Sequence, residues 1–160
     1  MVIREATIQD APAIAALRER TIRTVVAPLG IYSPDEIEAW ASGPSVDWIE
    51  RCIREEHALV AEECGRVVAA GRLRLDSPGA ATLRGMFVDA DLIGRGVGSR
   101  IIRHLLELGE GQGVRTFEVV ATLNAQSFYE RFGFERLGEV LHATPNAAVI
   151  PGVRMRRRAG

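Results

Sequence analysis

The sequence predicts a mixed α/β fold, in which a twisted and mostly antiparallel sheet of six to seven strands is flanked by about four helices. Residues 58–88 contain three consecutive strand-like runs with short connections. Residues 97–109 carry apolar side chains at helical spacing, and two further strand-like runs close the chain. The 160 residues are 47% hydrophobic and 26% charged, as in ordinary globular proteins. We therefore expect one domain over residues 1–160.

The first third of the chain predicts one strand followed by helical segments. Residues 2–6 are a short strand, and residues 7–10 offer capping groups for a helix. The apolar face of that helix carries Ile14, Leu17, Ile22 and Val25. Ser33 is placed as the N-cap of a second helix, and Glu36 completes a capping box. A further helical turn near Asp47 has an apolar side formed by Trp48, Ile49, Cys52 and Ile53.

The middle of the chain predicts an antiparallel face. Residues 58–62 and 66–75 form a hairpin, and residues 81–88 follow as a third strand. Gly85 lies inside that strand, which indicates a β-bulge or a close backbone approach. The remaining elements are a helix over 97–109, a strand over 116–122, a helix over 125–132, and strands over 135–142 and 149–156.

A glycine-rich turn opens the helix that begins at residue 97. Gly94, Gly96 and Gly98 leave backbone N–H groups free to face one point, and a helix N-terminus favours anions there. The turn therefore predicts a pyrophosphate site, with a ligand-free turn as the alternative. A P-loop is excluded, because it needs a lysine and all 20 basic residues here are arginine. A dinucleotide fingerprint is disfavoured, because its third glycine would come one residue later and closer to a strand.

Charge and cysteine content narrow the function classes. The net charge of −1 gives no broad basic face, so we expect no nucleic-acid partner. Cys52 and Cys64 lack the spacing of a disulfide framework. No membrane-spanning run or signal sequence is recognisable, which predicts a cytoplasmic protein without a membrane partner. No cluster of His, Cys, Asp and Glu has metal-ligand spacing, so no metal is expected.

Two motifs follow one another between residues 83 and 134. A strand and the glycine-rich turn come first; a strand, Asn124, the pair Phe128-Tyr129 and the pair Gly133-Phe134 come next. In this order and spacing the chain resembles the GNAT superfamily of N-acetyltransferases. One departure is Ile93, which stands where the family turn has Gln or Arg, so one side-chain contact to phosphate is lost. Arg95 is the expected compensating cation.

The resemblance implies a GNAT fold whose sheet is splayed at the cofactor site, with acetyl-CoA as the donor substrate. The pantetheine arm would lie in the splay like an added strand. The resemblance places the cofactor on Met86, Phe87, Val88, Gly94, Arg95, Gly96, Val97, Gly98, Ser99, Asn124 and Arg131. Asn124 is also expected to be the N-cap of the helix that follows it.

The expected chemistry is acyl transfer to an amine. The resemblance assigns Tyr129 as the general acid that protonates the CoA thiolate, and a phenol keeps its proton at neutral pH. Backbone N–H groups of Phe87 or Val88 would hold the oxyanion. The base stays open among Glu118, Asp76, His142 and a water relay. For the acceptor pocket, the segment 32–40 is the candidate, with Tyr32 and Trp40 as its aromatic residues.

The predicted function is therefore N-acetyl transfer from acetyl-CoA directly to an amine acceptor, either a small molecule or a peptide. Self-pairing through the last strands fits the fold, so a homodimer is one expectation. Two alternatives stay open. The chain could be a noncatalytic sensor that binds acyl-CoA, or a transferase that uses a longer acyl donor such as succinyl-CoA.

Overall fold

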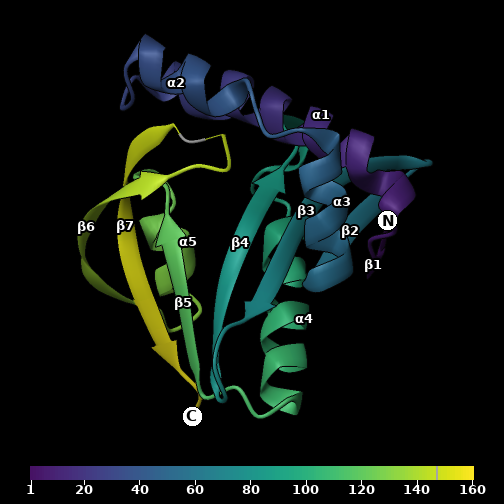
Figure 1. Cartoon of the computed structure of the whole chain (residues 1–160), viewed down its shortest axis with the longest axis vertical. Coiled ribbons are helices and arrows are strands. Elements are labelled where there is room, and N and C mark those ends of the chain that lie inside the picture. The colour runs from purple at the N-terminus through teal and green to yellow at the C-terminus, as the bar shows by residue number, and fades with distance from the viewer. Residues whose placement is uncertain (147) are drawn as a thin grey trace.

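A seven-stranded sheet organises the computed structural model, which describes residues 1–146 and 148–160. The strands lie in the order β1-β2-β3-β4-β5-β7-β6. Neighbouring strands are antiparallel except β4 and β5, which are parallel (Figure 1). Their bounds are β1 Val2–Glu5, β2 His57–Glu63, β3 Arg66–Leu75, β4 Ala80–Val88, β5 Thr116–Ala121, β6 Glu135–Ala143 and β7 Val149–Arg158. The predicted mixed α/β fold with a mostly antiparallel sheet is confirmed.

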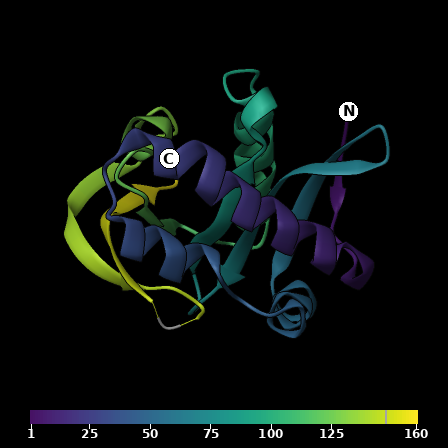
Figure 2. The same cartoon turned by 90° about the horizontal axis from the view of Figure 1, so that it is seen from above.

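Helices cover the sheet on two sides and at one end. The α-helices are α1 Ala11–Thr21, α2 Pro34–Ala41, α3 Val46–Glu55, α4 Val97–Gly111 and α5 Gln126–Glu130. Short turns of other helix types span Ile8–Asp10, Ile22–Val26, Ala27–Leu29 and Ala90–Leu92. Helices α1 and α2 cross the upper end of the sheet (Figures 1 and 2). Helix α4 packs against β2, β3 and β4 through a core that includes Ile101, Ile102, Leu105, Leu73 and Leu83.

The sheet opens between its two parallel strands. Strands β4 and β5 pair only from Ala80 with Thr116 to Leu83 with Val119. Beyond that point they diverge toward the end covered by α1 and α2 (Figure 1). From there to its end, β5 keeps only its pairing with β7. The backbone of β4 after Leu83 therefore faces the opening without a neighbouring strand on that side.

Gly85 is the bulge that the sequence predicts in β4. Its φ of 62° lies in the left-handed region, which a side chain would strain. The register between β3 and β4 shifts at this point, so that Phe87 pairs with Ala70 but Arg84 pairs with Arg72. Arg84 and Phe87 consequently share one face although they are three residues apart. The bulge thus reverses the alternation of β4, so that Leu83 before it and Met86 after it both pack on the α4 side.

Several predicted boundaries needed correction. The first helix does not continue to Val25 as a regular α-helix, because α1 ends at Thr21 and a wider π-type turn follows. Helix α5 is shorter than the predicted 125–132, since Gly133 adopts a φ of 83° and turn hydrogen bonds close its end. The prediction of Asn124 as N-cap is wrong, because Ala125 occupies that position. The capping box of Ser33 and Glu36 is confirmed.

Candidate active site

A cavity of about 390 Å³ occupies the opening between β4 and β5. Its walls come from distant parts of the chain: β3 and β4 on one side, β5, β6 and β7 on the other, and α1, α2 and α3 at the end. Tyr129 lines it on the side of α5, whereas Arg84 and His142 line it on the side of α1 and α3. The cavity therefore connects the two faces of the sheet, which allows two different molecules to meet in it.

Tyr129 is packed by aromatic rings on the α5 side. Its side chain is buried, and its ring meets Phe128 at 5.1 Å and Phe134 at 5.7 Å between centroids, both edge to face. Burial raises the pKa of the Tyr129 hydroxyl above its ordinary value. The phenol therefore keeps its proton at neutral pH and is available as a proton donor.

The glycine-rich turn has the backbone form that an anion site needs. Gly94 and Gly96 both have a φ of 81°, and added Cβ atoms would meet nothing within 4 Å. The Arg100 N–H donates to the Gly96 carbonyl at 3.0 Å as α4 begins. The N–H groups of residues 97–99 precede that bond and lie at the positive end of the helix dipole. Arg95 is exposed beside them.

Gly98 brings three elements of the site together. A Cβ at this position would lie 3.2 Å from Val88 Cγ2 and 3.5 Å from Phe128 Cζ. The absence of a side chain thus lets the N-terminus of α4 approach both the end of β4 and helix α5. The glycine-rich turn and Tyr129 are thereby held on the same side of the opening.

Asp89 anchors the loop between β4 and the glycine-rich turn, which the sequence reading did not anticipate. The side chain is buried, and it accepts hydrogen bonds from Arg20 at 3.0 Å, Arg66 at 2.9 Å and the Ala90 N–H at 3.0 Å. A carboxylate directly after a strand and before a short helical turn was the available local signal. Arg20 and Arg66 come from distant elements, so their convergence could not be read from the chain.

The predicted cofactor residues fall into two groups. Met86 and Phe87 line the cavity, and Val88 packs on the core side beneath α4. Asn124 and Arg131 are exposed, and Arg131 stacks on the Phe128 ring at 5.5 Å. Met86 and Phe87 are thus part of the cavity wall, residues 94–99 lie outside the lining residues at the N-terminus of α4, and Asn124 and Arg131 flank α5 at its surface.

Comparisons with known proteins agree with this arrangement. A family model described as an acetyltransferase (GNAT) domain matches residues 54–136, slightly more than half of the chain. The chain belongs to the GNAT acetyltransferase family. Its members are acyltransferases, and the matched segment includes the bulged strand, the glycine-rich turn and Tyr129.

Solved structures show the same fold along the whole chain. A GCN5-related N-acetyltransferase from Rhodopseudomonas palustris, named Aminotransferase, Class-II, is 23% identical with a TM-score of 0.85, covering 99% of this chain and 95% of the other. The PaiA N-acetyltransferase from Thermoplasma acidophilum, solved with coenzyme A, is 17% identical with a TM-score of 0.79, covering 99% and 98%. A ribosomal-protein-alanine N-acetyltransferase from Brucella melitensis is 22% identical with a TM-score of 0.72, covering 99% and 100%.

The candidate bases of this GNAT protein differ in their surroundings. Glu118 accepts hydrogen bonds from Arg156 at 2.8 Å and from Arg154 at 3.0 Å, which lower its pKa. Asp76 is bound by Arg74 at 2.6 Å and by the Thr82 hydroxyl at 2.6 Å. Both carboxylates are thus already paired with donors. His142 instead lines the cavity, and burial, followed by the charge of Arg84, lowers its pKa.

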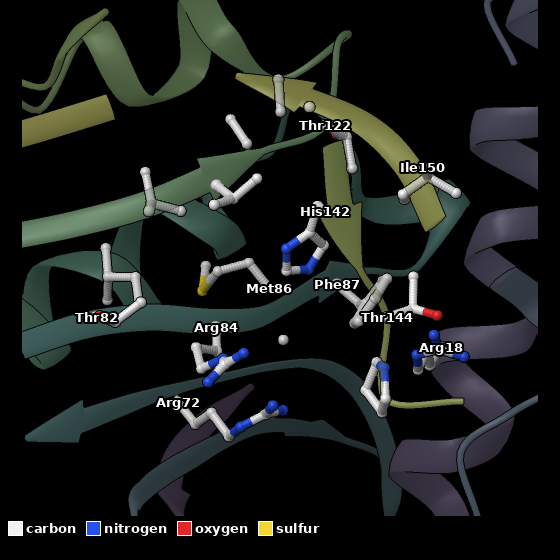
Figure 3. Close-up of a pocket in the computed structure, with 18 of the residues that line it drawn as sticks. Arg18, Arg72, Thr82, Arg84, Met86, Phe87, Thr122, His142, Thr144 and Ile150 are labelled. Atoms are coloured by element: carbon white, nitrogen blue, oxygen red, sulfur yellow. The ribbon is translucent and has the colours of Figure 1, made fainter. Parts of the chain in front are cut away.

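The side of the cavity facing α1 is rich in arginine, a feature that the sequence reading missed. Figure 3 shows Arg72 and Arg84 on one side, His142 across from them, and Arg18 at the end. Aromatic side chains complete this part of the GNAT cavity, namely Trp40, Trp48 and Phe87.

Tyr32 stabilises the end of the cavity near α2, but its side chain does not line the cavity. Its hydroxyl donates to the Pro151 carbonyl at 2.9 Å and accepts from the Leu123 N–H at 3.0 Å. The segment before α2 is thereby fastened to β7 and to the end of β5. Of the two aromatic residues predicted for the acceptor pocket, Trp40 lines the cavity and Tyr32 is part of the packed core.

Over residues 1–146 and 148–160, no helix is long and apolar enough to cross a membrane. The same residues contain no group of three or more His, Cys, Asp or Glu side chains arranged to hold a metal ion.

Proposed function

We propose that this protein is an N-acetyltransferase that moves the acetyl group of acetyl-CoA directly to an amine. The observation that carries the proposal is the cavity between β4 and β5, which Tyr129 lines on one side and His142 on the other. Burial raises the pKa of Tyr129, and burial and the charge of Arg84 lower the pKa of His142. Direct transfer requires donor and acceptor to meet in one cavity, and this opening reaches both faces of the sheet. Residues 1–160 would act as a single domain.

The cofactor would lie along the segment from Met86 to Ser99. Backbone groups of residues 86–88 face the opening without a paired strand, so they can bond to the pantetheine amides. The N–H groups around Gly96 and Gly98 would bind the pyrophosphate, because a helix N-terminus favours anions. Arg95 is exposed beside them and can supply the cation that Ile93 does not.

The proton transfers follow from the two titratable groups. The amine nitrogen attacks the thioester carbonyl carbon, a C–N bond forms, and the C–S bond breaks. Tyr129 donates its proton to the departing thiolate, whose pKa is about 8.5 if it behaves like cysteine. Backbone N–H groups of Phe87 or Val88 would stabilise the oxyanion. His142, directly or through water, would take the proton that the amine loses.

His142 is the base we favour over Glu118 and Asp76. A base must be unprotonated and free to accept, and both carboxylates are already held by arginine. The charged groups that line the same cavity are Arg18, Arg72, Arg74, Arg84 and Glu118. Burial, followed by the charge of Arg84, lowers the pKa of His142 and favours the neutral imidazole, which is the form that accepts a proton. The cationic surroundings also favour the neutral form of an acceptor amine.

A pair of variants at Gly96 tests the cofactor site. Asn and Asp tolerate the left-handed conformation of Gly96 better than other residues and differ in charge alone. We expect Gly96→Asp to weaken acetyl-CoA binding at least about tenfold more than Gly96→Asn, because its carboxylate would repel the pyrophosphate. Calorimetric titration measures both affinities. Gly111→Asp at the far end of α4 is the matched control for added charge.

Each outcome of the acetyl-CoA titrations has a different meaning for the cofactor site. Binding by the parent that is lost only in Gly96→Asp supports the assignment and justifies a screen of amines. Absence of acetyl-CoA binding by the folded parent protein would refute the proposed function. Equal binding by the Asp and Asn variants would place the pyrophosphate elsewhere.

A further inference from the structure

Two arginines stand directly opposite each other on the acceptor side of the sheet. Arg72 of β3 and Arg84 of β4 are register partners, so both side chains project from the same face. Like charges at such positions destabilise a sheet unless something offsets them. Arg72 is offset, because its Nε lies 2.7 Å from Glu56 Oε2 and its guanidinium lies 5.0 Å from the centre of the Trp48 ring.

Arg84 has no such partner. Within the described residues, no carboxylate lies within ion-pair distance of its guanidinium. The side chain lines the cavity and is half-buried, and burial together with Arg74 and Arg72 lowers its pKa. A guanidinium stays charged under these conditions. Arg84 therefore presents a guanidinium without a direct ion pair to whatever enters the acceptor side, and the carboxylate whose charge acts on it, Glu56, is held by Arg72.

Arg18 adds a second incompletely paired cation. It is 6% exposed, lines the same cavity, and donates from Nη1 to the Gly43 carbonyl. Its Nη2 is buried and makes no hydrogen bond within residues 1–146 and 148–160. A buried charged donor without a partner is costly to folding, and an oxyanion bound in the cavity would offset part of that cost.

The carboxylate that lines the cavity does not cancel these charges. Glu118 is already held by Arg154 and Arg156 on the other wall. His142 is drawn toward its neutral form by burial and by Arg84, so it adds no negative charge. The acceptor side thus carries a net positive charge, next to the apolar faces of Trp40, Trp48 and Phe87.

We propose that the acceptor amine carries an anionic oxygen group, a carboxylate or a phosphonate, which Arg84 binds, while Arg18 adds a second positive charge at the end of the same cavity. This inference rests on the proposed function and specifies the acceptor of the same site. Guanidinium groups bind both oxyanions through paired hydrogen bonds, so the two chemistries share the site. Polycationic amines are disfavoured, since their second ammonium group would meet Arg84 and Arg18 in a cavity with restricted access to water.

A matched acceptor series tests the proposal. Alanine, leucine and phenylalanine are each offered as the free amino acid, the amide and the α-aminophosphonate, with spermidine as the polycation. Release of CoA thiol gives kcat/KM for each. We expect the anionic forms to exceed the amides at least about tenfold, as charged hydrogen bonds are worth this much. The more active of the two anionic forms identifies the oxyanion.

Variants of Arg84 connect that selectivity to the structure. Arg84→Gln should bring the ratio of anionic to amide substrate close to one, mainly through KM, and Arg84→Lys should restore part of it. Arg18→Gln should lower the ratio as well. Arg136→Gln removes an exposed arginine of β6 and should leave the ratio unchanged. A ratio is independent of the fraction of folded enzyme, so partial unfolding cannot imitate the effect.

A binding measurement covers the case in which no amine of the series is acetylated. The chain has two tryptophans, Trp40 and Trp48, and both line the cavity, so intrinsic fluorescence reports on it. With CoA present, N-acetyl-leucine should change the fluorescence saturably at concentrations at least about tenfold below N-acetyl-leucinamide. The proposal would be overturned if the fluorescence responded equally to N-acetyl-leucine and N-acetyl-leucinamide, or to neither. It would also be overturned if the enzyme preferred amides or spermidine, or if Arg84→Gln left the selectivity unchanged. Failure of acetyl-CoA binding would instead count against the proposed function.

Discussion

The chain contains two tyrosines, and the structure predicts opposite consequences for removing their hydroxyl groups. Tyr129 lines the cavity, and its hydroxyl forms no hydrogen bond with the protein in the part of the chain that is described. The Tyr32 hydroxyl bonds to Pro151 and Leu123 and lies outside the cavity. Tyr129→Phe should therefore remove chemistry with little loss of stability, and Tyr32→Phe should do the reverse.

The magnitudes follow from these contacts. Loss of a general acid lowers kcat by about 10² to 10⁴, which is about 2.7 to 5.4 kcal/mol of transition-state free energy. Tyr129→Phe keeps the buried ring, so its effect on unfolding should stay below about 1 kcal/mol. Tyr32→Phe leaves the Leu123 N–H and the Pro151 carbonyl without their partner. That loss costs about 1 to 3 kcal/mol, or a fall in Tm of about 2 to 12 °C.

The assay combines steady-state thiol release, calorimetry with acetyl-CoA and thermal unfolding on the three proteins. Because burial raises the pKa of Tyr129, the phenol stays protonated and the parent kcat should not decline from its ionisation below about pH 9.5. Unchanged kcat in Tyr129→Phe, with amine acetylation rate-limiting, would refute its role as the acid. A loss of kcat in Tyr32→Phe equal to that in Tyr129→Phe would show that the effect is structural.

Three further predictions concern the strand bulge, the loop anchor and the base. Gly85→Ala should lower the free energy of unfolding more than Gly65→Ala. Both glycines have a positive φ, but only a Cβ at residue 85 would collide with Arg72 Nη1. Thermal unfolding of the two variants measures the difference. Asp89→Asn should destabilise the protein by about 1 to 3 kcal/mol and weaken acetyl-CoA binding, because it releases Arg20 and Arg66 from the loop before the glycine-rich turn. Denaturant unfolding measures the stability, and calorimetry measures the binding. Because burial and the charge of Arg84 lower the pKa of His142, the acid limb of the kcat profile should lie at lower pH than that of an ordinary imidazole. His142→Gln should lower activity and remove that limb, and an unchanged profile would exclude His142 as the base.

Local signals in the sequence predicted much of the fold. The capping box at Ser33 and Glu36, the bulge at Gly85 and the helix after Gly96 each depend on residues close together in the chain, and each is confirmed. The α5 boundary was less accurate, because five helical residues give a weak periodic pattern and the turn at Gly133 decides where the helix ends.

The acceptor side could not be predicted in the same way, because tertiary contacts create it. Arg72 and Arg84 face each other through the pairing of β3 with β4, in the register that precedes the bulge, and Arg18 arrives from α1. In the sequence each is an ordinary arginine among 20 basic residues. Their alternation with the core residues Leu73 and Leu83 was visible, but it gave no indication that both would face a cavity.

The bulge at Gly85 links the two halves of the candidate site. Without the extra residue, Arg84 and Met86 would share a face, and Phe87 would turn toward the core beneath α4. With it, Met86 packs toward α4 while Phe87 joins Arg84 on the acceptor side. Gly85 therefore allows the end of β4 to diverge from β5, and it keeps Arg84 on the same face as the aromatic ring of Phe87. The proposed donor and acceptor positions both depend on β4, so a change in this strand should alter both KM values together.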